Sequence, residues 1–111
     1  MKASREEALS ILSKWRNESL SVLVIFGIAG ASLQLSGAIT DVSSSLVTFR
    51  HGSNHFEFTI GLEEGRDFDY SDMREAPADV QESHGQRVYS RLSVEFASGA
   101  FCQIFEAAPK G

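Results

Sequence analysis

The chain has 111 residues, of which 42% are hydrophobic, and a formal net charge of −5. A chain of this length is expected to form one domain, residues 1–111, and to bury roughly two thirds of its unfolded surface, so it needs no disulfide to fold. The negative charge repels polyanions on average, so any nucleic-acid binding would depend on a local basic patch.

An amphipathic helix is predicted near the start of the chain, over about residues 5–17. Ser4 precedes Glu7 by three residues, which is the spacing of a capping box at a helix start. A lone helix of this length is marginal in water, so we expect it to pack across the open end of a sheet or barrel. Its apolar stripe has residues at intervals of three and four: Ala8, Leu9, Ile11, Leu12 and Trp15.

Residues 19–40 carry no charged side chain. This run is about as long as the roughly 20 apolar residues that cross a bilayer, but its pattern favours strands. Residues 21–26 form a β-branched run that ends at Gly27, and residues 33–36 alternate apolar with polar. Several glycines and Gln34 also disfavour a spanning helix. We therefore expect two strands joined by a turn at 27–30, and no membrane partner.

The rest of the chain indicates more strands, which would complete a barrel over about residues 21–106. β-forming runs occupy 46–50 and 56–62, and two final strands occupy 88–96 and 100–106. Between them, residues 63–86 are rich in charged residues and are predicted to be an acidic loop, whose early part, 67–70, alternates and is compatible with an extension of the preceding strand.

The final strands are short and apolar, and they lack the lysines and prolines that usually block strand addition. We therefore expect them to form an exposed edge that recruits a second copy of the chain, which makes the protein a homo-oligomer. The residues expected at this edge are Val94, Phe96, Phe101 and Ile104.

Two glycine-centred segments carry a resemblance to a known family. Leu35-x-Gly37-x-Ile39 resembles the bend in the second strand of the first Sm motif, and residues 94–99, which end in Gly99, resemble the second motif. A strand in a tightly curved barrel and a tight turn both favour a residue without Cβ. The order of elements is likewise similar to that of the Sm-like superfamily. The resemblance implies a mainly β fold, with the N-terminal helix packed on a five- or six-stranded antiparallel Sm-like or SH3-type barrel, and ring assembly.

The RNA-contacting residues of that family do not carry over to this sequence. Alignment on Gly37 places Ser43 and Val47 where the family has an acid and an amide, and Ser98 where it has a basic residue. RNA binding therefore stays as an alternative that uses basic residues near the N-terminus, although Glu6, Glu7 and Glu18 lie among them. These basic residues are Lys2, Arg5, Lys14 and Arg16.

No local pattern predicts a metal site, a cofactor site or catalysis. Residues 67–72 begin like a calcium loop, but Asp72 stands where the loop glycine belongs and Ala78 where the closing glutamate belongs. His51 and His55 flank a turn and would need further ligands to hold a metal. Cys102 has apolar neighbours, which indicates a buried side chain rather than a nucleophile.

We therefore expect a cytoplasmic, non-enzymatic interaction or assembly module that needs no cofactor. The alternative is an RNA-binding ring. A small enzyme would require polar groups that converge in a pocket, which a sequence cannot reveal.

Overall fold

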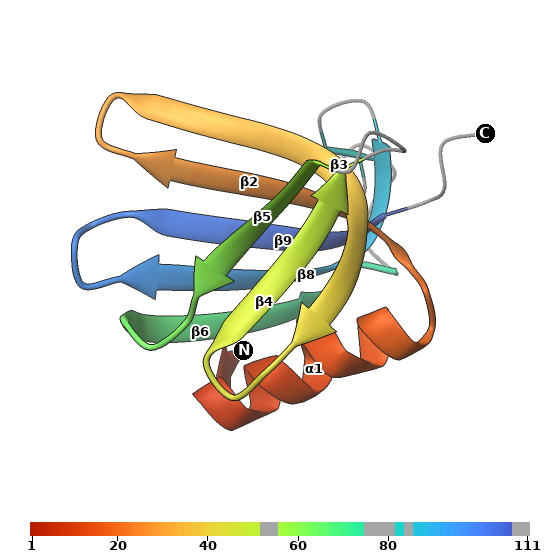
Figure 1. Ribbon diagram of the computed structural model, residues 1–111, viewed down its shortest axis with the longest axis horizontal. Coiled ribbons are helices and arrows are strands. Elements are labelled where there is room, and N and C mark those ends of the chain that lie inside the picture. The colour runs from red at the N-terminus through yellow and green to blue at the C-terminus, as the bar shows by residue number, and fades with distance from the viewer. Residues whose placement is uncertain (52–55, 75–81, 84–85, 108–111) are drawn as a thin grey trace.

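The computed structural model spans residues 1–111 and describes residues 1–51, 56–74, 82–83 and 86–107. Over these residues the fold is mainly β, with one helix and an antiparallel sheet (Figure 1). In chain order, the elements are β1 (Lys2–Ala3), α1 (Arg5–Asn17), β2 (Ser21–Ile28), β3 (Ala31–Val42), β4 (Leu46–His51), β5 (Phe56–Gly61), β6 (Gly65–Asp72), β7 (Glu82–Ser83), β8 (Gln86–Phe96) and β9 (Phe101–Ala107).

Helix α1 begins with the capping box that the sequence predicts. The Glu7 backbone N–H donates to Ser4 Oγ at 3.0 Å, and the Ser4 N–H donates to Glu7 Oε1 at 3.1 Å. The stripe then buries Ala8, Leu12 and Trp15, and the helix packs on β3 and β6. An apolar face at helical spacing therefore both stabilises α1 and closes one end of the core.

The uncharged segment forms two antiparallel strands, as its pattern predicts. Strands β2 and β3 pair from Ser21 opposite Ala38 to Ile28 opposite Ala31. In the part of the chain that the structure describes, no helix is long and apolar enough to cross a membrane.

The sheet curls because β3 changes partner along its length. Its first part pairs with β2, and its second part, from Ala38 onward, pairs with β4. The strand order is β1-β6-β8-β9-β2-β3-β4-β5, with β7 attached to β8. In Figure 1, β4 and β5 cross over the strands behind them. Among the described residues the end strands β1 and β5 do not pair, so the sheet stays open rather than closing into a barrel.

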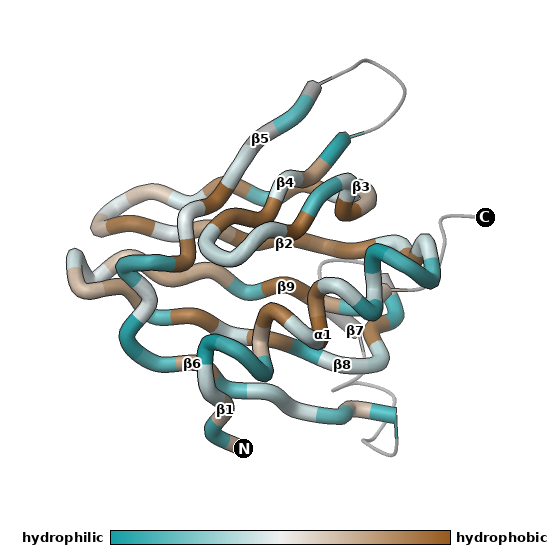
Figure 2. Tube along the Cα trace, turned by 60° about the horizontal axis from the view of Figure 1, so that its bottom comes forward, coloured by the Kyte–Doolittle hydropathy of each residue, from teal (hydrophilic) through white to brown (hydrophobic). Residues whose placement is uncertain are grey.

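The main core fills the concave side of the curled sheet, under α1. A second, smaller cluster lies on the opposite side of β2, β8 and β9, around Leu23 and Phe105. In Figure 2, hydrophobic residues run along β2 and β9, in the middle of the sheet. A sheet with both faces partly covered explains why β2 is apolar at consecutive positions. Fully buried residues of the main core include Leu12, Val47, Leu62, Leu92, Cys102 and Ile104.

Two expectations about the second half of the chain are wrong. Residues 65–72 are neither a loop nor an extension of the preceding strand: they form the separate strand β6, which pairs with β8. Phe68 is buried there between the exposed Asp67 and the half-buried Asp69. Strands β8 and β9 are not edges either, since each has a neighbour on both sides. The backbone around Val94, Phe96, Phe101 and Ile104 is thus paired within the chain and cannot recruit another copy.

Candidate functional site

The four predicted basic contact residues do not form one patch. Lys2 lies on β1, where its Nζ is 3.6 Å from Asp67 Oδ1. The other three are exposed on α1. Arg5 and Lys14 are nine residues apart, which is two and a half helical turns, so they lie on opposite sides of the helix. Arg16 is in the last turn, far from Arg5 along the axis. This arrangement offers no continuous cationic surface for phosphates.

Gly37 and Gly99, the glycines that carry the family resemblance, lie where a side chain would clash or strain the backbone. A Cβ built on Gly37 would lie 2.0 Å from the Arg50 carbonyl oxygen, because β4 crosses close to β3 at the bend. Gly99 has a φ of +90°, in the turn between β8 and β9. Only glycine adopts that conformation without strain. Both residues shape the sheet, and neither contributes a functional group.

His51 lies at the end of β4, where its Nδ1 is hydrogen-bonded to the Ser36 carbonyl oxygen of β3. His55 lies outside the described residues. The described part of the chain holds no group of three His, Cys, Asp or Glu side chains that could bind a metal ion.

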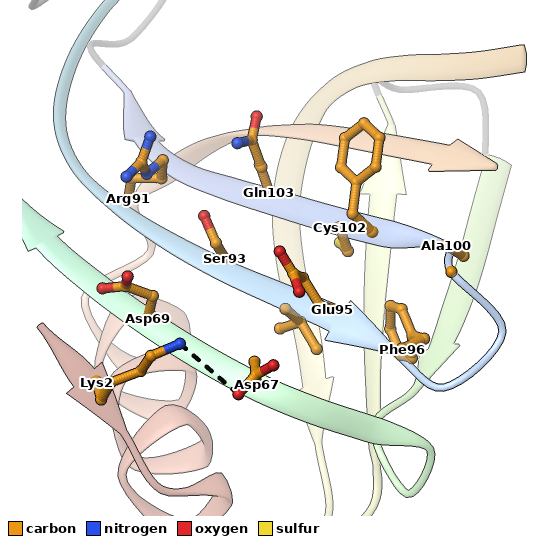
Figure 3. A pocket seen from close by; sticks show the side chains of 13 residues that line it. Lys2, Asp67, Asp69, Arg91, Ser93, Glu95, Phe96, Ala100, Cys102 and Gln103 are labelled. Carbon is orange, nitrogen blue, oxygen red and sulfur yellow. Dashed lines mark ion pairs between the residues drawn. The ribbon is translucent and has the colours of Figure 1, made fainter. Parts of the chain in front are cut away.

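A polar groove of about 490 Å³ lies on β6, β8 and β9, beside β1 (Figure 3). Its charges are of both signs. Lys2 is paired with Asp67, and the N-terminal ammonium of Met1 is 2.6 Å from Asp69 Oδ1. That hydrogen bond lowers the pKa of Asp69. Arg91 Nε is buried and has no hydrogen-bond partner among the described residues. The groove also has polar side chains from Ser93, Glu95 and Gln103.

Cys102 is not available as a nucleophile in the polar groove. Cys102 contributes to its floor, but the side chain is fully buried, and burial raises the pKa of the thiol to about 12. The reactive form of a cysteine is the thiolate, which is negligibly populated at neutral pH for such a group. Cys102 is therefore a core residue, in agreement with its apolar sequence context.

A second hollow is apolar, and we call it the apolar mouth. It has a volume of about 430 Å³ and lies where the β2–β3 turn, the β8–β9 turn and the end of β5 meet. Ile28 and Leu33 are 55% and 51% exposed there, and the rings of Phe26 and Phe96 have centroids 6.2 Å apart. The apolar lining consists of Phe26, Ile28, Leu33, Ile60, Phe96 and Ala100. Concave apolar surfaces at the mouth of a curled sheet are common binding sites.

The free edge of β5 borders the apolar mouth. The Leu62 N–H donates to the Ser45 carbonyl at 2.7 Å, next to the pair Leu46 opposite Gly61. Hydrogen-bonded and non-hydrogen-bonded pairs alternate along an antiparallel ladder. Ile60 therefore directs its backbone groups toward β4. The N–H and C=O groups of Glu57, Thr59 and Gly61 point away from β4, where no described strand pairs with them.

Sequence reasoning missed both the apolar mouth and this edge. One signal was present: Ile28 and Leu33 are large aliphatic residues close to a tight turn, where a solvated hairpin end normally has polar side chains. Nothing in the sequence indicated that the end of β5 lies beside that turn, because this proximity results from the curl of β3.

No protein-family model, no curated protein and no solved structure matches this chain.

Proposed function

We propose that the protein is a non-enzymatic interaction module that binds an extended polypeptide strand along the free edge of β5. One side chain of that strand would occupy the apolar mouth. The observation that carries this proposal is the position of three outward backbone N–H and C=O pairs, at Glu57, Thr59 and Gly61, directly beside an apolar hollow. Unpaired edges of this kind are templates for strand addition.

The free edge of β5 and the apolar mouth are placed so that one added strand could contact both. Successive side chains on a strand point to opposite sides of the sheet. Ile60 and Thr59 both line the apolar mouth, but Ile60 is buried on the side of the main core, while Thr59 is exposed and follows on the other face of β5. The residue of an added strand that lies opposite Ile60 would share its side and enter the mouth. Backbone hydrogen bonds would thus supply affinity, and the mouth would select an apolar side chain.

Burial of existing apolar surface adds to the affinity. Ile28 and Leu33 are each about half exposed, and complete burial of such a side chain contributes about 1.5–3 kcal/mol. Covering both would therefore contribute on the order of 2 kcal/mol, before the cost of association is subtracted. The side chains of Glu57 and Arg50 are already paired at 3.2 Å on the exposed side, so strand addition leaves no new unpaired charge there.

We also propose that the fold is of the Sm-like type. Its support is the bent second strand at Gly37, the Gly99 turn and an N-terminal helix that packs on the curled sheet. The resemblance implies ring assembly, which agrees with an interaction role. The alternative, an RNA-binding ring that uses Lys2, Arg5, Lys14 and Arg16, has no comparable support.

Selection from a phage-displayed library of random peptides would test the proposal. Thr59→Pro removes one outward N–H while leaving the bonds to β4 intact, since proline is tolerated at such edge positions. Thr59→Val keeps that N–H and is the matched control. We expect selected peptides to share an apolar residue and to lose at least about tenfold in affinity with Thr59→Pro only, the cost of about one lost hydrogen bond. Failure of the monomeric chain to select peptides, or equal binding by the proline variant, would refute the proposal.

A further inference from the structure

We infer that the strand added at this edge is β5 of a second copy of the chain, paired antiparallel about a two-fold axis at Thr59. This inference rests on the proposed function and names its partner. It gives the protein a self-association surface made of Glu57, Thr59 and Gly61, with the apolar mouths of both copies on one side of the joined sheet.

The register follows from which backbone groups are free. In an antiparallel pair of identical edges, the outward residues of one copy must meet the outward residues of the other. With the axis at Thr59, Thr59 of one copy lies opposite Thr59 of the other, and Glu57 of each copy lies opposite Gly61 of the other. All three outward residues of β5 then form hydrogen-bonded pairs. An axis at Gly61 would leave Glu57 without a partner in β5. An axis at Glu57 would leave Gly61 without one.

Avoidance of a like-charge contact favours the same register. An axis at Glu57 would place two carboxylates directly opposite each other, which is destabilising in a sheet. The axis at Thr59 instead places each Glu57 opposite Gly61, which has no side chain. Each Glu57 also keeps its ion pair with Arg50 of its own chain. Two threonines at the central pair are a favourable combination on a solvated face.

The joined sheet also brings the two apolar mouths together. A two-fold axis that passes through an antiparallel pair is perpendicular to the sheet, so the Ile60 side chains of both copies lie on the same side. The half-exposed Ile28 and Leu33 of each copy border that side. Each chain has a net charge of −5, so the overall repulsion weakens the association at low ionic strength, and added salt should strengthen it.

A charge-swap experiment at the axis tests the inference. We expect sedimentation velocity to show a dimer for the wild-type chain. Thr59→Lys and Thr59→Glu should each associate with themselves about fivefold more weakly, because like charges meet at the central pair. An equimolar mixture of the two variants should form a heterodimer at least as tight as the wild-type dimer. That rescue also demonstrates that both variants fold.

Thr48→Lys is the matched control. Thr48 lies opposite Thr59, and the Oγ atoms of the two residues are 3.0 Å apart. Because Thr48 is on β4, it is one strand further than Thr59 from the two-fold axis. Its charge would be separated from that of the other copy by more than a Debye length, so the dimer should be unaffected. Thr48→Lys therefore separates a positional effect from a general effect of added charge.

Other outcomes would overturn the inference in distinguishable ways. A wild-type dimer that persists unchanged in Thr59→Lys would mean that the copies meet elsewhere. The wild-type chain could instead be monomeric at every concentration reached and still select peptides whose binding is weakened by Thr59→Pro. That result would refute the inference that the partner is a second copy, and it would leave the proposed function in place. A monomer that also selects no peptide would refute both.

Discussion

Ser90 Oγ donates a hydrogen bond of 2.8 Å to Glu106 Oε1, and both residues lie buried on the facing strands β8 and β9. Arg74, which follows β6, completes the arrangement: its Nη2 lies 2.9 Å from Oε1 and 3.0 Å from Oε2 of Glu106. The Arg74 guanidinium also lies 5.8 Å from the ring centroid of Tyr89, and the carboxylate of Glu106 raises the pKa of Arg74. This network ties the segment after β6 to the middle of the sheet.

Glu106→Ala should lower the free energy of unfolding by about 1–3 kcal/mol, because it leaves the buried Ser90 hydroxyl without its acceptor and Arg74 without its carboxylate. Urea unfolding followed by circular dichroism measures the change. Glu106→Gln is the control, since it keeps an acceptor for Ser90, and it should cost less. Equal urea midpoints for the wild type and Glu106→Ala would show that the network contributes nothing to stability.

Stability should fall above pH 9 because of Cys102. The pKa of its thiol is about 12 in the folded protein and about 9.0 when it is exposed, so only the unfolded chain releases the proton between these values. A raised folded pKa contributes stability that is present below pH 9 and is lost as the pH rises toward 12. Between pH 8 and pH 10, this loss is about 1.4 kcal/mol.

Cys102→Ala isolates that effect from the titration of lysines and tyrosines. Urea unfolding at pH 8 and pH 10 should show that the difference in unfolding free energy between the wild type and Cys102→Ala narrows by about 1.4 kcal/mol at the higher pH. If the two proteins lose equal stability over this interval, the thiol titrates alike in both states, and the assignment of Cys102 to the core is wrong.

Gly37→Ala should destabilise the protein by more than about 2 kcal/mol, since the new Cβ would lie 2.0 Å from the Arg50 carbonyl and would force β3 and β4 apart. Gly61→Ala is the matched control in β5, where the added Cβ would make an ordinary contact of 3.7 Å with Leu46 Cδ2. Alanine there should be neutral or should stabilise by up to about 1 kcal/mol. Thermal unfolding of both variants provides the comparison, and similar midpoints would contradict the close approach at Gly37.

Ser4→Ala should cost about 1 kcal/mol of stability, because it removes the acceptor of the Glu7 N–H at the start of α1. Ser10→Ala, at an exposed position within the same helix, should instead stabilise slightly through its higher helix propensity. Chemical denaturation of the two variants should therefore shift in opposite directions. A shift in the same direction would indicate that the capping box does not contribute.

Helix α1 and the β2–β3 hairpin could be predicted because their signals are local. The capping box at Ser4 and Glu7 and the stripe that ends at Trp15 lie within a few turns of one another. The uncharged segment likewise contains its own turn and its own alternation. Residues 65–72 were assigned mostly to a loop because their composition is acidic. The alternation at 67–70, where Phe68 and Tyr70 follow aspartates, indicated extended structure but not a separate strand paired with β8.

The sequence by itself determined where the strands and the helix form, since the spacing of apolar residues and the position of glycines act within one segment. Only the tertiary structure decided which strand ends the sheet. Strands β9 and β5 carry similar apolar residues, but β9 has a partner on each side and β5 has one. That difference depends on the path of the whole chain, because the bend at Gly37 turns β4 and β5 away from the rest of the sheet and leaves the last backbone groups of β5 without a partner strand among the described residues.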